Sequence, residues 1–154
     1  KEDSISAKSI KIEGFIIDYS DSSKLSGVIV EIYKHDYLFR IDSTDEYGNY
    51  RFYGLYFNRG YKLIYRKEGY VSNQIYLNLD CPDSLQNFSE LTVNNELMLF
   101  KGKECKDYKL ERSYKAAYRF HREYSKFYWD FEVKKMYRYW IEDYEKCTDE
   151  LNKK

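Results

Sequence analysis

Side chains suited to catalysis or metal binding are scarce in this sequence. It contains two histidines, His35 and His121, among 154 residues. His35 falls in a predicted turn and His121 on a stripe of aromatic residues, so we favour structural roles for both. The sequence has no H-E-x-x-H, C-x₂-C or G-x-S-x-G pattern, the spacings typical of zinc sites and serine hydrolases. We therefore predict no catalytic residue, no metal site, no cofactor and no enzymatic activity.

Acidic residues gather in predicted loops, where they could supply oxygen ligands to calcium. They are Asp18, Asp21, Asp42, Asp45 and Glu46. Their spacing differs from the D-x-[DN]-x-[DN]-G pattern of calcium-binding loops. Aspartate also accepts hydrogen bonds from the backbone of its own turn, and we favour this turn role over a calcium site.

Basic and aromatic residues are interleaved between Tyr108 and Phe127, a mixture that can stack on bases and neutralise phosphates. The whole chain, however, carries 26 basic and 26 acidic residues, so no global attraction for nucleic acid is expected. An acidic stretch follows, from Glu142 to Glu150. This segregation of charge fits a protein partner, either another protein or a second copy, better than a nucleic acid.

Three cysteines allow at most one disulfide within the chain. Cys81 and Cys105 bracket one predicted strand and form the natural bridge if the protein is exported, which leaves Cys147 as a thiol. Three reduced, partly buried thiols are an equally good interpretation.

The elements that carry these residues are strands over the first two thirds of the chain. The segment Asp42–Leu55 predicts a β-hairpin, with alternating residues on both sides of a polar tip. Similar alternation recurs every eight to twelve residues, which is typical of a sandwich or barrel. Seven strands are predicted, at 9–18, 28–33, 37–44, 49–55, 61–66, 71–79 and 92–100.

From about residue 106 the pattern changes to that of a helix. Glycine and proline are absent after Lys103, and aromatic residues recur at every third or fourth position. The stripe shifts phase around Trp129–Val133, so we predict either one long helix that breaks there or two helices. The two predicted regions are a sandwich at 8–101 and an aromatic-rich helical tail at 106–151.

The aromatic rings of the tail should not remain in water, because burying a few of them yields roughly 10 kcal/mol before entropy. We expect at least half of the tail to dock on a sheet, with Trp140 in the seam and tyrosines such as Tyr33, Tyr53 and Tyr65 beneath it. The predicted contact surface of the tail consists of Tyr124, Tyr128, Trp129, Tyr137, Trp140 and Tyr144.

Four motifs occur in a fixed order between residues 9 and 80: Ile12-Glu13-Gly14-Phe15-Ile16-Ile17-Asp18, Leu25-Ser26-Gly27-Val28-Ile29-Val30-Glu31-Ile32, Thr44-Asp45-Glu46-Tyr47-Gly48-Asn49-Tyr50-Arg51-Phe52 and Lys67-Glu68-Gly69-Tyr70. This order resembles the carboxypeptidase regulatory-like domain, whose hallmarks are G-x-V-x-D, P-L-x-G-V-x-V, T-D-x-x-G-x-Y-x-F and K-x-G-Y. The resemblance implies a seven-stranded, transthyretin-like β-sandwich. Lys24 departs from the family, which often has proline there.

Residues 69–100 are also similar to uncharacterised cell-envelope proteins of Bacteroidetes, which implies export to the periplasm or outer membrane. The chain begins at Lys1 without an apolar signal core, and we interpret it as a form from which the signal peptide has been removed. No segment approaches the ~20 apolar residues of a transmembrane helix.

We therefore expect a non-catalytic accessory or interaction module of the cell envelope. The sandwich would be a rigid spacer, and the helical tail a packing or partner-contact surface. The alternative is a small-molecule or glycan binder that uses exposed aromatic residues such as Trp129 and Trp140. A third hypothesis is a transthyretin-like hydrolase, for which His35 and Arg51 are the polar groups to test.

Overall fold

The computed structural model describes residues 9–82, 91–102, 116–121, 126–129 and 131–153. Within these ranges the chain forms ten strands and one helix. They are β1 (Ile10–Asp18), β2 (Ile29–Lys34), β3 (Tyr37–Ser43), β4 (Asn49–Leu55), β5 (Gly60–Arg66), β6 (Tyr70–Val71), β7 (Asn73–Asn78), β8 (Leu91–Lys101), β9 (Ala116–His121), β10 (Lys126–Trp129) and α2 (Phe131–Asn152).

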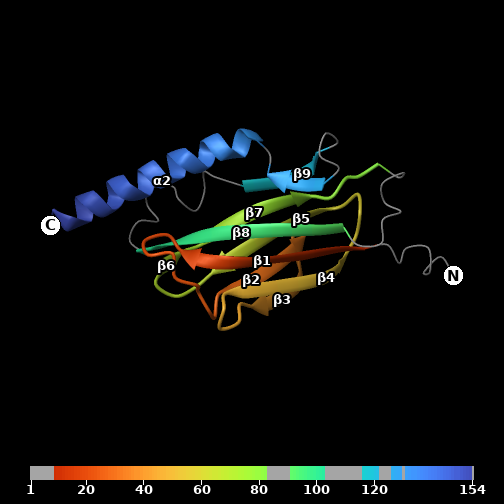
Figure 1. Ribbon diagram of the computed structural model, residues 1–154, viewed down its shortest axis with the longest axis horizontal. Coiled ribbons are helices and arrows are strands. Elements are labelled where there is room, and N and C mark those ends of the chain that lie inside the picture. Colours follow the sequence, from red (N-terminus) through yellow and green to blue (C-terminus); the bar gives the residue numbers. More distant parts are fainter. Residues whose placement is uncertain (1–8, 83–90, 103–115, 122–125, 130, 154) are drawn as a thin grey trace.

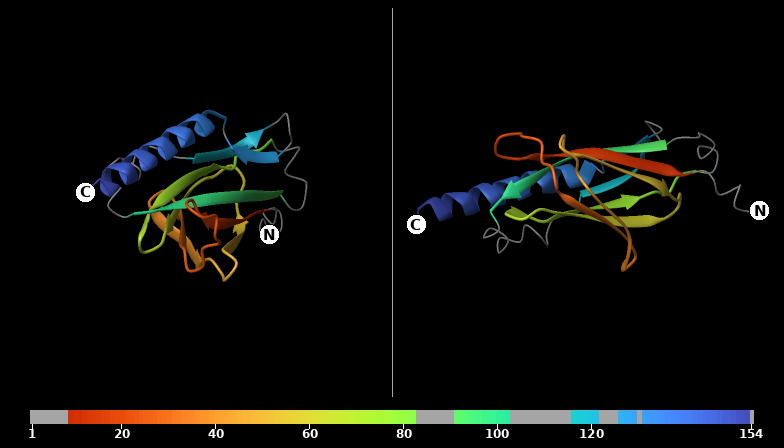
Figure 2. Two further views of the ribbon diagram at one scale, coloured as in Figure 1. Left: turned by 60° about the vertical axis from the view of Figure 1, so that its left-hand side comes forward. Right: turned by 90° about the horizontal axis from the view of Figure 1, so that it is seen from below.

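The strands form two sheets packed face to face, and α2 crosses one end of this sandwich (Figures 1 and 2). One sheet has the order β4-β1-β8-β6 and the other the order β10-β9-β7-β5-β2-β3. Pairing is antiparallel except between β1 and β8 and between β7 and β9. A mainly β sandwich with a C-terminal helix confirms the predicted fold class, although the described residues contain more than the seven strands predicted.

Alternate residues of each strand fill the space between the sheets. In β5, Tyr61, Leu63 and Tyr65 are buried while Arg66 is exposed, as a period of two residues requires. The hydroxyl oxygens of Tyr65 and Tyr50 lie 2.8 Å apart inside the core. Burying these phenols therefore costs little, because each polar tip has a hydrogen-bond partner.

The segment Asp42–Leu55 is not the β-hairpin that we predicted. The turn itself is tight, since the Gly48 N–H donates to the Asp45 carbonyl at 2.9 Å. Beyond the turn, however, β3 pairs with β2 and β4 pairs with β1. The turn therefore carries the chain from one sheet to the other.

Gly48 allows this turn to sit against the first strand. Its φ is +77°, and a Cβ built there would lie 2.8 Å from the Ile16 carbonyl oxygen. The Ile16 N–H in turn donates to the Gly48 carbonyl at 2.9 Å. Only glycine combines this left-handed backbone with so close an approach.

The predicted strand at 71–79 is two strands that belong to different sheets. Val71 of β6 pairs with Phe100 of β8, whereas Asn73 of β7 pairs with Tyr65 of β5. The chain crosses between the sheets at Ser72. Alternation continues through the crossing, because both strands still bury their apolar residues, and so the sequence pattern does not reveal it.

The prediction of a helical tail at 106–151 was wrong for residues 116–121 and 126–129, and residues 106–115 lie outside the described part. Residues 116–121 and 126–129 form β9 and β10, which extend the larger sheet beyond β7. The helix begins at Phe131, within the region where the aromatic stripe changes phase. In the part of the chain that the structure describes, no helix is long and apolar enough to span a membrane.

Candidate interaction surface

One side of the sandwich is bordered by two unpaired edge strands. β3 is the outermost strand of the larger sheet, and β4 is the outermost strand of the smaller one. Figure 1 shows both on the same side of the molecule, joined by the Asp45–Asn49 turn. We call residues 37–56 the open edge. Within the described part of the chain, no neighbouring strand pairs with the outer sides of β3 and β4. Such edges are potential sites of intermolecular pairing.

The open edge also carries most of the exposed apolar surface of the described residues. Among the described residues, eight large hydrophobic residues are exposed, and six of them lie in the open edge: Tyr37, Leu38, Ile41, Tyr47, Tyr53 and Tyr56. Tyr37 is 78% exposed, Tyr53 58% and Ile41 57%. Exposed apolar residues that cluster in this way mark contact surfaces more often than scattered ones do.

Arg40 connects the two edge strands. Its guanidinium donates a hydrogen bond to the Tyr53 carbonyl of β4 and lies 4.7 Å from the centre of the Phe39 ring. Gly54 makes room for it, because a Cβ there would lie 3.4 Å from an Arg40 nitrogen. Gly54 also has a φ of +75°, at a point where the β1–β4 register shifts by one residue, as expected for a glycine in a β-bulge.

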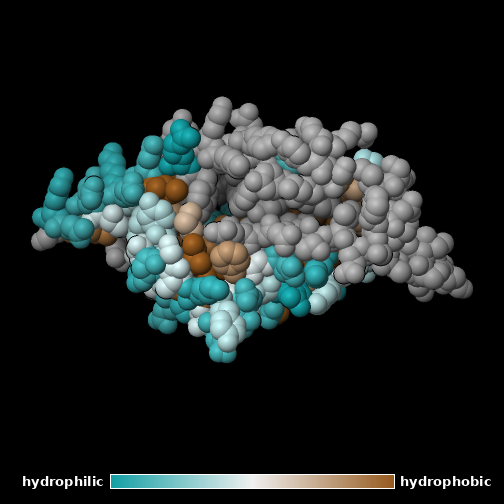
Figure 3. Space-filling model, in the orientation of Figure 1, coloured by the Kyte–Doolittle hydropathy of each residue, from teal (hydrophilic) through white to brown (hydrophobic). Residues whose placement is uncertain are grey.

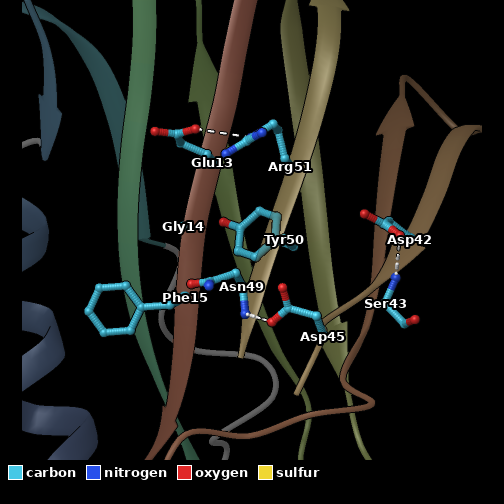
Figure 4. A pocket seen from close by; sticks show the side chains of 9 residues that line it. All are labelled: Glu13, Gly14, Phe15, Asp42, Ser43, Asp45, Asn49, Tyr50 and Arg51. Carbon is cyan, nitrogen blue, oxygen red and sulfur yellow. Dashed lines mark hydrogen bonds and ion pairs between the residues drawn. The ribbon is translucent and has the colours of Figure 1, made fainter. Parts of the chain in front are cut away.

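A polar groove of about 580 Å³ lies beside the open edge (Figure 4). Glu13 of β1 and Arg51 of β4 are paired along one wall, with Arg51 Nε 3.1 Å from Glu13 Oε1. Asp42 and Asp45 line the side that faces β3. The groove therefore contains charges of both signs, and its one guanidinium is already neutralised.

Three of the acidic side chains considered for calcium binding accept hydrogen bonds from their own turns. Asp42 Oδ1 accepts the Ser43 N–H at 2.8 Å, and Asp45 Oδ1 accepts two N–H groups of its turn at 2.9 Å each. Asp21 accepts the Ser23 N–H at 2.9 Å. These are the turn contacts that we favoured over calcium coordination.

The opposite end of the sandwich is closed by α2. Phe100 and Val71 form a small core with Tyr144 and Cys147 of the helix, and the Phe100 and Tyr144 rings lie 4.6 Å apart. Tyr19 packs on both rings and donates a hydrogen bond to Glu145 Oε2 at 3.0 Å. Figure 3 shows hydrophobic residues gathered between α2 and the strands beneath it, within a mainly hydrophilic described surface.

Asp18 is a buried carboxylate at this closed end. Its Oδ1 accepts the backbone N–H and the hydroxyl of Ser20, at 2.7 and 2.5 Å, and its Oδ2 accepts the Tyr70 hydroxyl at 2.6 Å. Lys101 Nζ lies 3.5 Å away. Burial by itself raises the pKa of Asp18, but these hydrogen bonds and the lysine charge outweigh it, so the pKa lies below its usual value. Burial and the hydrogen bond to Asp18 raise the pKa of Tyr70.

The docking of the tail is confirmed, but it uses other residues than we predicted. The helix rests on Tyr19, Val71 and Phe100, whereas Tyr65 lies in the sandwich core and Tyr53 is exposed. Tyr33 is half-buried. The sequence signal for the true docking site was weak, because Tyr19 stands in a loop-like stretch and Phe100 ends a strand.

The predicted contact surface of the tail is divided among several elements. Tyr144 is only 8% exposed and belongs to the small core beneath α2, so it packs on the sandwich. Tyr128 and Trp129 belong to β10 and Tyr137 and Trp140 to α2, but their side chains lie outside the described part. Tyr124 lies outside the described residues altogether.

The predicted Cys81–Cys105 disulfide was also wrong. Cys81 is a thiol buried in the sandwich core, whereas Cys147 is disulfide-bonded. Cys105 lies outside the described residues.

The polar residues named for a hydrolase do not form a common site. His35 is exposed in the β2–β3 turn with a φ of +57° and is not among the residues that line the groove. Arg51 is paired with Glu13 and donates to the Tyr53 hydroxyl at 3.2 Å. His121 is buried at the end of β9.

No protein-family model and no curated protein matches the sequence. Among solved structures, the chain is similar to the TIE protein of Bacillus anthracis, with 19% identity, a TM-score of 0.49, and coverage of 60% of this chain and 17% of that one. It is also similar to the 3-chlorocatechol 1,2-dioxygenase of Rhodococcus opacus, with 15% identity, a TM-score of 0.46, and coverage of 62% and 61%. A third is the pilus 2b backbone protein of group B streptococcus, with 22% identity, a TM-score of 0.43, and coverage of 62% and 42%. This chain spans less than two thirds of each of these proteins, and similarity at this level carries no argument about activity.

Proposed function

We propose that this chain is a non-catalytic interaction module that binds a protein partner through the open edge. The observation that carries the proposal is the concentration of exposed apolar side chains in residues 37–56, along strands whose outer edge no other strand of the described chain joins. This moves the contact surface away from the helical tail, where we first expected it. In the described residues, α2 packs on the sandwich through Tyr144 and Cys147.

The polar groups near the open edge support a binding role rather than a catalytic one. The carboxylates of Asp42 and Asp45 accept turn amides, and Arg51 is paired with Glu13. Under this proposal the sandwich holds the edge rigid, and the module works in the cell envelope. The envelope location rests on the sequence resemblance alone.

The proposal can be tested by site-specific photo-crosslinking in the cells that naturally produce the protein. A benzophenone amino acid placed at Tyr37 or Tyr53 should form adducts with a protein partner, because both side chains are exposed on the open edge. The matched control is Tyr76 of β7, which is exposed but lies outside the edge. Adducts that form equally at Tyr76, or at none of the three positions, would contradict the proposal.

The polar groove favours a second candidate, the binding of a hydroxyl-rich ligand such as a glycan. Its carboxylates, the amide of Asn49 and the guanidinium of Arg51 are groups that orient hydroxyls in binding sites. Titration with an oligosaccharide panel tests this candidate. Binding that is lost in Arg51→Ala and retained in Arg59→Ala, an exposed arginine outside the groove, would support it, and binding unaffected by either change would exclude the groove.

A further inference from the structure

The outer edge of β3 offers backbone groups in a regular pattern. The Thr44 N–H donates to the Val28 carbonyl at 2.9 Å, so the backbone of Thr44 points toward β2. Backbone groups alternate in direction along a regular strand, so those of Asp42 also point toward β2, while those of Ile41 and Ser43 point outward. In agreement with this, the Ser43 N–H is bonded to the Asp42 side chain.

We propose that a second copy of this chain is the partner of β3, paired antiparallel about a twofold axis at Ile41. This inference rests on the proposed function, because it names the partner of the open edge. Such a dimer is isologous, and the two larger sheets become one continuous sheet. We infer a second copy rather than another protein because, in one antiparallel register, basic and acidic residues of β3 lie opposite each other in the two copies.

Symmetry restricts the registers that are available. Residues directly opposite in an antiparallel pair share one face of the sheet, so the twofold axis must pass between a residue and its own copy. An axis at Arg40 places two guanidinium groups opposite each other, and an axis at Asp42 places two carboxylates opposite each other. An axis at Ile41 places Arg40 of each copy opposite Asp42 of the other.

The same register also suits the backbone. Because the Ile41 groups point outward, the two copies of Ile41 form a hydrogen-bonded pair with two N–H···O=C bonds. Arg40 and the opposite Asp42 then occupy a non-hydrogen-bonded pair, in which side chains approach most closely. Ser43 can pair with Phe39 of the other copy once its N–H leaves Asp42, which frees that carboxylate for the opposite arginine. Arg40 in turn exchanges its hydrogen bond to the Tyr53 carbonyl for this carboxylate.

The side chains near the axis are apolar on the outer face of the sheet. Ile41 is 57% exposed and lies opposite Glu31 of β2, and Ile29 is exposed beside Ser43. Leu38 is exposed farther along β3. In the dimer the two Ile41 side chains cover each other, and Leu38 of each copy lies close by. The chain carries no net charge, so long-range repulsion does not oppose this association.

The contact is short, and the association is therefore concentration-dependent. The β2–β3 register shifts between Ile32 and Tyr33, which leaves a bulge in β3 at Phe39. A regular ladder is then confined to residues 39–43. Bulges of this kind limit pairing at sheet edges, so we expect monomer and dimer to exchange rapidly.

Sedimentation of the purified full chain, from micromolar concentrations to ~1 mM, tests the proposal. The wild type should dimerise reversibly. In the Asp42→Arg dimer, an arginine would face another arginine at both symmetry-related positions. Dimerisation should therefore weaken at least about tenfold. The double variant that combines Arg40→Asp with Asp42→Arg should restore the dimer dissociation constant to within about threefold of the wild type, because an acidic side chain again lies opposite a basic one. Asp80→Arg makes the same charge change after β7 and should have no effect.

A second pair of variants keeps the test decisive if the double variant unfolds. Ile41→Lys places two ammonium groups at the axis and should abolish dimerisation, whereas Tyr76→Lys, a matched change on β7, should not. A wild type that stays monomeric throughout, or a dimer indifferent to Asp42→Arg and Ile41→Lys, overturns the inference. If the chain is monomeric but crosslinks from Tyr37 reach a different protein, only the choice of partner fails. If no crosslinks form anywhere, the proposed function itself fails.

Discussion

Tyrosine is used in opposite ways at the two sides of this sandwich. At the end closed by α2, the hydroxyls of Tyr19 and Tyr70 are hydrogen-bonded to carboxylates, and Tyr144 is buried. Along the open edge, Tyr37 and Tyr53 are mostly exposed. The difference is one of secondary-structure context. A helix covers the first group, whereas the second lies on edge strands that no other element of the described chain covers. A high tyrosine content therefore marks a contact surface only where the fold leaves the rings uncovered.

Opening the Cys147 disulfide should have the largest effect on the closed end. Loss of this bridge should lower the free energy of unfolding by about 4 kcal/mol, because the unfolded chain is then no longer constrained. Chemical denaturation of Cys147→Ser beside the wild type measures the change. Mass spectrometry of the denatured, non-reduced wild type should find Cys147 in a disulfide and Cys81 as a thiol. Three free thiols would exclude the bridge.

Matched tyrosine substitutions compare the two sides directly. Tyr144→Ser removes a buried ring that packs on Phe100 and should destabilise the protein by about 3 kcal/mol. Tyr37→Ser removes an exposed ring and should change stability by less than about 0.5 kcal/mol. Urea denaturation at low protein concentration, where the chain is monomeric, gives both values. Equal effects would mean that the closed end and the open edge do not differ as described.

Glycine substitutions test how the open edge is attached to the rest of the fold. Gly48→Ala combines left-handed backbone strain with a contact against the Ile16 carbonyl, and should cost about 3 kcal/mol. Gly69→Ala has a similar positive φ but open space around its Cβ, and should cost about 1 kcal/mol. Thermal denaturation of both variants measures the difference in their loss of stability. The two losses should be equal if the turn does not pack closely against β1.

Acidification should weaken the closed end through Asp18. Its pKa is lowered in the folded state, so its carboxylate contributes stability above about pH 4, and this contribution disappears as the pH falls through the lowered pKa. Asp18→Asn resembles the protonated form, and should be less stable than the wild type by about 2 kcal/mol at pH 7. The two melting temperatures should converge as the pH falls through the lowered pKa of Asp18. Asp80→Asn, an exposed control, should follow the wild type at every pH.

The order and boundaries of the first strands could be predicted because alternation reports which face of a strand is buried. It does not report which sheet the strand belongs to. For this reason the sheet change at Ser72 and the crossing between β3 and β4 were both missed. The turn residues Asp45 and Gly48 identified a reversal of the chain, but they fit a turn between sheets as well as a hairpin.

The segment 116–129 was assigned to a helix because Ala117, His121 and Tyr128 follow helical spacing. The same segment holds Phe120 and Trp129, which favour strands. The strand prevails over the helix because β7 has one edge that β5 does not occupy, and β9 pairs with this edge in parallel. Cysteine pairing was missed for a similar reason. Closeness in sequence favoured Cys81, whereas pairing depends on distances that only the folded chain defines.

The parallel pairing of β1 with β8 has a consequence for how this protein folds. Ile10 pairs with Leu91 and Asp18 with Leu99, so the central contact of the smaller sheet joins segments that are made at very different times. During synthesis β1 can pair with β4 early, but its other side must wait for β8. Topologies that depend on such distant contacts fold slowly, on the scale of milliseconds to seconds. Until β8 arrives, the nascent chain has an additional unpaired strand edge, that of β1, and chaperone binding should be concentrated in this interval.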